Sequence, residues 1–248
     1  MKKRRWFSLF LSFALLLPLF SLTSADAYED FTLDAKAGLL IEADTGEILY
    51  EKNAHQENFP ASLTKVMVAL LVFEAIDEGK IALTDSVTAT ESAFEGLSSD
   101  GSTANIVPGE TMTVEQLLNC MLIVSANEAC NILGETLCGS VDAFVARMNE
   151  RAAELGCEHT HFANATGLHN SQHYTTAWDL YLITREALKH DKFMEICNSK
   201  SYTVPATNMT DKPRELHSTN FLISNWRARG YVYRDAQGIK TGSTPEAG

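Results

Sequence analysis

Ser62 and Lys65 are three residues apart, a spacing that lets a lysine amine activate a serine hydroxyl. Residues three apart on a helix lie on one face, so the two side chains can meet. A serine hydroxyl is a weak nucleophile until a neighbouring base takes its proton. Lysine can be that base when burial lowers its pKa from about 10.4 towards neutrality. The pair therefore predicts acyl transfer through Ser62, whose N–H near a helix N-terminus can face a developing oxyanion.

The same spacing has a simpler interpretation, in which the serine caps a helix and the lysine reaches solvent from its surface. About one S-x-x-K match arises by chance in a chain of this size. Here the match precedes residues 66–73, which are apolar on every face of the expected helix. Burial of Lys65 is therefore plausible.

Two further motifs carry groups that can bind or relay protons. Ser125 and Asn127 place a hydroxyl and an amide two residues apart between expected helices, and either can instead cap the second helix. Lys240 and Thr241 offer a cation and a hydroxyl to an anionic group, and Gly242 lets a substrate backbone approach closely. The alternative for this last motif is an ordinary strand end. Each motif alone is weak.

Hydrophobic periodicity and turn residues predict the elements that must position these groups. A β-hairpin is expected from two strands around Asp44-Thr45-Gly46, and β-like sequence with loops returns from residue 201 to the K-T-G motif. A helix buried on all sides is expected at 61–78, and four more helices at 113–123, 127–137, 140–155 and 176–189. The order indicates one α/β domain with a helical insertion.

The first 27 residues have the pattern of a signal peptide. Four basic residues precede an apolar stretch at 6–22, and the small residues at 25–27 form a cleavage site. An uncleaved anchor is the alternative. We expect residues 28–248 to form the catalytic domain of an exported protein associated with the cell wall or membrane. The formal charge of −12 disfavours nucleic acid as a partner.

The cysteines and histidines do not form an evident metal or disulfide pattern. The five cysteines have irregular spacing, which makes apolar packing the better expectation although one or two bridges are possible. Four histidines at 159, 161, 169 and 173 fall in a loop-like segment without a carboxylate–histidine helix motif. No metal and no cofactor is therefore expected.

Together and in this order, S-x-x-K, S-x-N and K-T-G form the signature of the penicillin-recognising serine enzymes. From about residue 37 to residue 248 the chain resembles the low-molecular-mass D-alanyl-D-alanine carboxypeptidases, a class of penicillin-binding proteins. The matching segments are residues 60–65, 108–110, 125–130, 162–168, 240–244 and 247–248. The resemblance implies a β-lactamase/transpeptidase-like α/β fold, with an antiparallel sheet packed against helices and an all-helical subdomain.

The resemblance also implies a substrate and a reaction. Ser62 would attack the carbonyl between the two D-alanines of a peptidoglycan stem peptide, release the terminal D-alanine and form an acyl-enzyme that water hydrolyses. β-Lactam antibiotics would acylate the same serine. Lys65 would be the base, Ser125 would relay protons towards the leaving amine, and Asn127 would hold Lys65 and a substrate amide.

At the far end of the chain, Lys240 and Thr241 would receive the terminal carboxylate. Gly242 would admit the substrate backbone, and the N–H groups of Ser62 and Ser243 would form the oxyanion hole. The family often has glycine where this chain has Ala126, which leaves the shape of the cleft open.

Three expectations concern completeness and rival activities. Relatives continue past the K-T-G strand, with further strands, a helix and often a C-terminal membrane anchor, so we expect a truncated sheet and poor stability of residues 28–248. An inactive penicillin-binding remnant is one alternative. A class A-like β-lactamase is another, although its E-x-x-x-N pattern is missing between residues 127 and 240.

Overall fold

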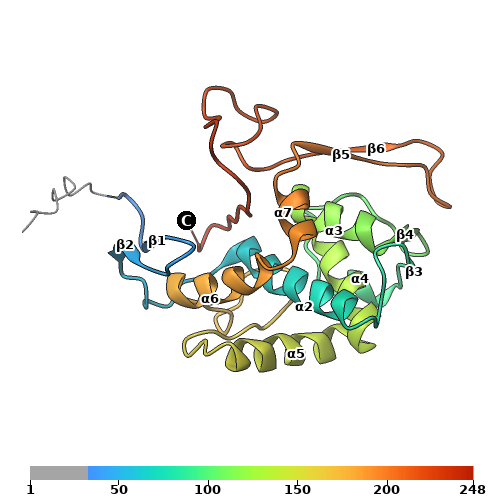
Figure 1. Ribbon diagram of the computed structural model, residues 1–248. Coiled ribbons are helices and arrows are strands. Elements are labelled where there is room, and N and C mark those ends of the chain that lie inside the picture. Colours follow the sequence, from blue (N-terminus) through green and yellow to red (C-terminus); the bar gives the residue numbers. More distant parts are fainter. Residues whose placement is uncertain (1–32, 248) are drawn as a thin grey trace, which may run out of the picture. The chain divides into compact units, whose positions relative to one another are not determined.

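The computed structural model describes residues 33–247, so the expected signal peptide lies outside the described residues. From Lys36 onward the chain forms one compact unit. Its helices form a block (Figure 1), with bounds η2 Ala61–Thr64, α2 Lys65–Asp77, η3 Ser92–Phe94, α3 Val114–Ile123, α4 Asn127–Cys138, α5 Val141–Glu154, α6 Ala177–Ala187 and α7 Asp191–Cys197. No helix of the described part is long and apolar enough to cross a membrane.

Helix α2 is the hydrophobic centre of this block. Its residues from Lys65 to Phe73 are all buried, and the helix packs against α3, α4, α5 and α6. A helix that is apolar all round is stable only when neighbours cover every face. The expectation of a helix buried on all sides is therefore confirmed, and it fixes the position of Lys65 at the first turn.

The other four expected helices are also present, each within a few residues of its expected bounds. Thr113 starts α3 with a capping box, in which its side chain accepts from Gln116 N and the Gln116 side chain accepts from Thr113 N. Ser140 and Thr176 cap α5 and α6 in the same hydroxyl-to-backbone manner. Helix α7 was not expected, because seven residues present too short a periodic pattern.

The strands form three separate two-stranded antiparallel sheets in the described part of the chain. The expected hairpin is confirmed, with β1 pairing to β2 through an irregularity between Leu40 and Ile41. The bounds are β1 Gly38–Ile41, β2 Ile48–Lys52, β3 Ser86–Thr88, β4 Thr111–Thr113, β5 Ser201–Val204 and β6 Arg214–His217. The structure is thus an α/β arrangement in which small antiparallel sheets accompany a helical core.

One expectation about the strands is wrong. Residues 240–242, which carry the K-T-G motif, are not in a strand. A strand requires ladder hydrogen bonds to a neighbour, and within the described residues β1 and β2 pair only with each other. The motif nevertheless lies against the start of α2, as described below.

The Pro108-Gly109-Glu110 segment directly precedes β4, and the Glu110 side chain contacts the loop that follows β5. Glu110 is 1% exposed, and its carboxylate accepts hydrogen bonds from Thr207 Oγ1 at 2.8 Å and from the Arg214 guanidinium. A buried carboxylate is stable only when paired in this way. Glu110 therefore ties the β5–β6 hairpin to the helical block.

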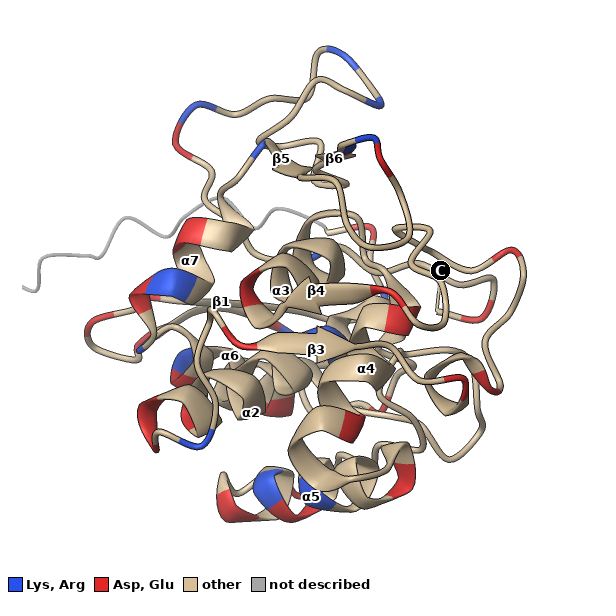
Figure 2. Cartoon of the chain, turned by 90° about the vertical axis from the view of Figure 1, so that its right-hand side faces the viewer, with Lys and Arg blue, Asp and Glu red and all other residues tan. Residues whose placement is uncertain are grey.

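The cysteines pack as expected, since all five are unpaired and four of them are buried, namely Cys120, Cys130, Cys157 and Cys197. Most charged residues are exposed or half-buried, and Figure 2 shows acidic and basic residues mixed along α5. There Arg151 makes an ion pair with Glu74 of α2 at 2.7 Å. This contact joins α5 to the helix that carries Lys65.

Candidate active site

Ser62 lies in the 3₁₀ turn η2, directly before α2. The preceding residue, Ala61, is 2% exposed and has φ +48°, a left-handed conformation that costs a non-glycine residue free energy. Such strain persists only where the surrounding structure enforces it. The backbone at the expected nucleophile is therefore held in place by tertiary contacts.

Lys65 is fully buried and contacts three oxygen atoms. Its Nζ lies 3.1 Å from Ser62 Oγ, 2.8 Å from Asn127 Oδ1 and 2.6 Å from the carbonyl oxygen of Thr166. Ser62, the first residue of the S-x-x-K motif, and Asn127, the last residue of the S-x-N motif, thus both contact the Lys65 amine. The simpler interpretation of Lys65 as a surface lysine is wrong, because its side chain has no solvent exposure.

The surroundings of Lys65 favour an uncharged amine. Burial lowers its pKa, and the nearby Cys130 and Glu128 oppose this shift only in part. The Thr166 carbonyl and the Asn127 amide oxygen can only accept hydrogen bonds. A neutral amine satisfies both with its two N–H groups and leaves its lone pair for the Ser62 hydroxyl. This is the arrangement that general-base activation of a serine requires.

Ser125 lies in the connection between α3 and α4, and Asn127 is the first residue of α4. Asn127 N donates to Ser102 O at 2.9 Å, which fixes the start of α4 beside the 98–102 loop. Ser125 is 4% exposed with φ +66°, and its Oγ has no hydrogen-bond partner within the described residues. A buried hydroxyl without a partner is rare and often marks a functional group.

The loop at residues 163–168 supplies the third contact of Lys65. Asn164 Oδ1 accepts hydrogen bonds from the N–H groups of Thr166 and Gly167, at 3.1 and 2.8 Å. Asn164 Nδ2 in turn donates to Leu168 O at 2.9 Å. The side chain of Asn164 therefore sets the loop that presents the Thr166 carbonyl to the lysine.

The K-T-G motif packs against the turn that carries Ser62. A methyl group on Gly242 would lie 3.0 Å from Pro60 O and 3.1 Å from Ser62 N, so only glycine fits without a shift. Thr241 Oγ1 lies 2.6 Å from Thr219 Oγ1. Burial is the largest cause that lowers the pKa of Lys240, to about 7. The spatial meeting of the first and last motifs is thereby confirmed.

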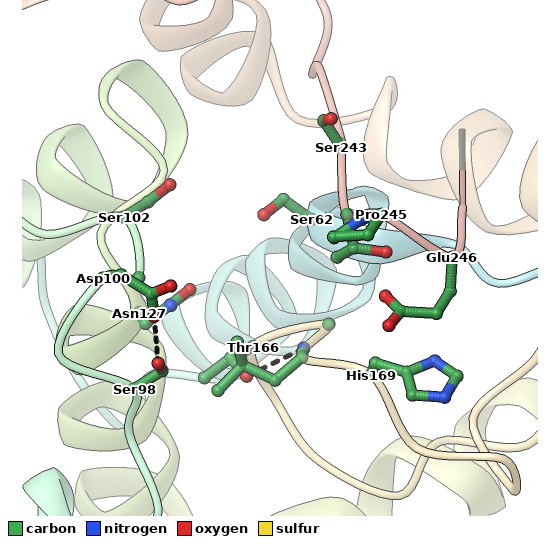
Figure 3. A pocket seen from close by; sticks show the side chains of 14 residues that line it. Ser62, Ser98, Asp100, Ser102, Asn127, Thr166, His169, Ser243, Pro245 and Glu246 are labelled. Atoms are coloured by element: carbon green, nitrogen blue, oxygen red, sulfur yellow. Dashed lines mark hydrogen bonds between the residues drawn. The ribbon is translucent and has the colours of Figure 1, made fainter.

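A pocket of about 260 Å³ opens at Ser62. Figure 3 shows Asp100 on one side of it and Glu246 with His169 on the other. The remaining lining residues are Ser98, Gly101, Ser102, Asn127, Thr166, Gly167, Leu168, Ser243, Thr244 and Pro245. Ser62, Asn127 and Ser243 thus border one cavity. The other expected site residues do not line it, namely Lys65, Ser125, Lys240, Thr241 and Gly242.

Glu128 positions the loop that forms one side of the pocket. Its Oε1 accepts hydrogen bonds from Thr103 Oγ1 at 2.7 Å and from Ala104 N at 2.8 Å. Because Glu128 is 3% exposed, this carboxylate is stabilised by these donors rather than by water. Glu128 follows Asn127 directly, so the same helical turn contacts the lysine and holds the loop.

The clustered histidines have separate partners. His159 faces the Glu57 carboxylate, His161 contacts the Gln172 carbonyl, and His169 packs edge-on against Phe59. His173 is buried against Thr64. No group of three metal-ligating side chains was found in the part of the chain that the structure describes.

The sequence patterns gave no role to the Thr166 carbonyl, Asn164, Gly167 or His173. The A-N-A-T-G-L segment matches the family without indicating what it does. The available signal was an asparagine two residues before a Thr-Gly pair, which is typical of an Asx-stabilised loop.

The site has a buried lysine beside a serine on the turn before a helix, and two distant segments close on this pair. This is the arrangement expected of a serine acyl-transfer site. Among known proteins, the family model of the D-alanyl-D-alanine carboxypeptidases matches residues 23–248. The chain belongs to this family.

Similar proteins include D-alanyl-D-alanine carboxypeptidase DacF of Bacillus subtilis, which is 40% identical over 214 residues, covering 86% of this chain and 52% of DacF. The chain thus spans about half the length of several curated relatives. A D-alanyl-D-alanine carboxypeptidase of Streptomyces sp. strain K15 is 30% identical over 235 residues, covering 91% of this chain and 77% of the relative.

Solved structures show the same fold. The Streptomyces K15 DD-transpeptidase aligns with a TM-score of 0.78 and 29% identity, over 88% of this chain and 84% of that one. PBP3 of Streptococcus pneumoniae, described as a peptidoglycan synthesis regulatory factor, aligns with a TM-score of 0.76 and 31% identity, over 88% and 60%. The expected transpeptidase-like fold is therefore confirmed.

Proposed function

We propose that this protein is a serine-type D-Ala-D-Ala carboxypeptidase that removes the terminal D-alanine from peptidoglycan stem pentapeptides. The observation that carries the proposal is the buried Lys65 amine 3.1 Å from Ser62 Oγ, with its two N–H groups directed to acceptor oxygens. Family membership supports the same reaction.

In the first step, Lys65 removes the proton of Ser62 as Oγ attacks the carbonyl between the two D-alanines. The oxygen of that carbonyl gains negative charge as the new C–O bond forms. The N–H groups of Ser62 and Ser243 are the proposed donors to this oxyanion. The close approach of Gly242 to Ser62 N supports this pairing of the two segments.

The C–N bond then breaks, and the leaving D-alanine amine takes up a proton. Ser125, a buried hydroxyl with no partner within the described residues, is the proposed relay for that proton. Asn127 is proposed to hold Lys65 and a substrate amide. Lys240 and Thr241 are proposed to bind the terminal carboxylate, with a charge-assisted hydrogen bond from the lysine.

Water hydrolyses the acyl-enzyme, with Lys65 as the base for the second attack. An amine can attack the same intermediate, and the structural similarity to a DD-transpeptidase supports transpeptidation as a second outcome. A β-lactam would acylate Ser62 in the same way. Its acyl group is expected to leave slowly, whereas rapid turnover would favour a β-lactamase.

The proposed setting is the cell wall, outside the cytoplasm. A peptidoglycan substrate lies there, and the basic and apolar leader at residues 1–27 supports export. The proposed partners are stem peptides and β-lactam antibiotics. The acidic net charge gives no support for nucleic acid binding.

The direct test is to incubate the protein with a muramyl pentapeptide and to measure free D-alanine, with Ser62→Ala as the control. D-alanine release from the parent protein alone is the expected result. A folded parent protein that releases none would instead indicate an inactive penicillin-binding remnant. Adding glycine as an acceptor amine separates hydrolysis from transpeptidation by the mass of the product.

The site also predicts a bell-shaped pH dependence of kcat/KM for a substrate with a free carboxylate. Activity rises with pH as Lys65 loses its proton, and it falls as Lys240 loses the charge that binds the carboxylate, at a pKa of about 7. Lys240→Arg keeps the charge and should move the descending limb well above pH 7. A descending limb that is unchanged in Lys240→Arg would contradict this assignment.

A further inference from the structure

Behind the nucleophile, three hydrogen bonds run in one direction from Ala163 through His173 and Thr64 to Ala61. The Ala163 N–H donates to His173 Nδ1 at 3.1 Å, so this nitrogen carries no proton. The proton of the neutral ring therefore lies on Nε2, which is 2.7 Å from Thr64 Oγ1. Since Nε2–H occupies Thr64 Oγ1 as an acceptor, the Thr64 hydroxyl donates to Ala61 O at 2.8 Å.

The three residues that form these last two hydrogen bonds are buried. Ala61, Thr64 and His173 are each 1–2% exposed. Burial is the largest cause that lowers the pKa of His173, to about 4, so the ring is neutral under ordinary conditions. The direction of the hydrogen bonds is therefore fixed, and it does not depend on exchange with water.

The last of these hydrogen bonds is accepted by the peptide unit that bears the proposed oxyanion donor, the Ser62 N–H. Ala61 O and Ser62 N belong to the same planar trans peptide, so holding the carbonyl on one side directs the N–H to the opposite side. A donor on a peptide carbonyl also polarises its N–H and strengthens it as a donor. The Thr64 hydroxyl thus acts on the Ser62 N–H through the peptide bond.

Two glycines confine the same peptide. A methyl group on Gly167 would come within 1.8 Å of Ala61 O and 2.9 Å of Ser62 N, and one on Gly242 within 3.1 Å of Ser62 N. The positive φ of Ala61 shows that its conformation is imposed on it. Packing thus restricts the position of the peptide, and the Thr64 hydrogen bond adds a fixed direction for its carbonyl.

We propose that Thr64 and His173 are positioning residues that orient the Ala61–Ser62 peptide, so that the Ser62 N–H faces the oxyanion formed during acylation. Neither residue touches the substrate. Thr64 acts on the carbonyl of the peptide, and His173 holds the Thr64 hydroxyl in the donating orientation. This inference rests on the proposed acyl transfer through Ser62.

The first test compares Thr64→Val with Thr64→Ser. Valine has the shape of threonine without the hydroxyl, and serine keeps the hydroxyl. We expect Thr64→Val to lower the rate constant of acylation by a penicillin by about 10- to 100-fold, since loss of a whole oxyanion donor costs about 10²- to 10³-fold. Thr64→Ser should stay within about threefold of the parent protein.

A second readout separates this role from an effect on the lysine base. An acylaminomethylboronic acid forms a tetrahedral anion when Ser62 Oγ bonds to boron and the serine proton passes to Lys65. Its affinity should fall in Thr64→Val by a factor similar to that of acylation. The ascending limb of the acylation pH profile should not move, because the Lys65 contacts are unchanged.

The matched control is Thr136→Val. The Thr136 hydroxyl also donates to a backbone carbonyl one helical turn earlier, Ile132 O at 2.7 Å, but it lies in α4 outside the site. Its loss should leave acylation within about twofold of the parent rate. Thermal unfolding followed by circular dichroism establishes that each variant is folded.

Two variants of His173 test the same inference if Thr64→Val does not fold. Glutamine can accept from Ala163 N and donate to Thr64, whereas leucine can do neither. His173→Gln should therefore acylate at least about tenfold faster than His173→Leu. His159→Gln, at a half-exposed histidine, is the control.

Three results would overturn the inference. The first is a folded Thr64→Val that acylates as fast as the parent protein, and the second is equal rates for the two His173 variants. The third is a shifted ascending limb without loss of boronic acid affinity, which would place the effect on Lys65. If the parent protein is neither acylated by a penicillin nor releases D-alanine, the proposed function is wrong, and this inference fails with it.

Discussion

Replacing Lys65 by arginine is expected to lower the rate constant of acylation by a penicillin by about 10³- to 10⁴-fold. Arginine keeps a positive charge at every accessible pH, so it cannot accept the serine proton. It also brings five donors to a position where the Asn127 and Thr166 oxygens and a hydroxyl are the acceptors. The measurement is stopped-flow acylation with a fluorescent penicillin.

The control for this prediction is Lys80→Arg, because Lys80 is an exposed lysine whose ion pair with Glu78 lies on the surface. Its acylation rate should equal that of the parent protein. Lys65→Met, which is similar in length and uncharged, should be as inactive as Lys65→Arg if the loss concerns the base. If either variant retained a tenth of the parent rate, another group would have to be the base.

Replacing Gly167 by alanine is expected to damage both the fold and the site. Gly167 has φ +84°, and an added methyl would lie 1.8 Å from Ala61 O. Backbone atoms cannot yield as a side chain does, so the 163–168 loop must move away from Ala61 and Lys65. We expect a loss of about 3 kcal/mol in the free energy of unfolding and a loss of acylation of at least about 100-fold.

Gly156→Ala separates the free-energy cost of the left-handed backbone conformation from the cost of the contact with Ala61. Gly156 has a similar φ of +79°, but no atom lies within 4 Å of the added methyl. This variant should lose only about 1 kcal/mol, as expected for alanine in a left-handed conformation, and it should acylate normally. Urea unfolding and penicillin acylation measure the two effects. Similar behaviour of the two alanine variants would contradict the contact between Gly167 and Ala61.

Much of the arrangement was predictable from the sequence because it rests on local patterns. The apolar run after Lys65 predicts a helix buried on all sides, and the capping box at Thr113 predicts the start of α3. The S-x-x-K spacing predicts the contact of Ser62 with Lys65. The link of Lys65 to Asn127 and the approach of Gly242 required the family resemblance, since they join distant segments.

The remaining contacts of the site leave weak traces in a sequence. The Thr166 carbonyl is a backbone group, so residue type carries no signal for it. His173 meets Thr64 from 109 positions away, and a histidine in a loop does not identify its partner. The strand expected at 240–242 is absent because strand formation depends on a neighbouring strand, which local composition cannot supply.

The central claim is that Ser62 is the nucleophile, activated by the buried Lys65. The most direct measurement is to acylate the protein with a fluorescent penicillin, digest it and locate the added mass by mass spectrometry, with Ser62→Ala in parallel. The label is expected on the peptide that contains Ser62, and Ser62→Ala should remain folded and unlabelled. A label on another residue, or equal labelling of folded Ser62→Ala, would contradict the claim.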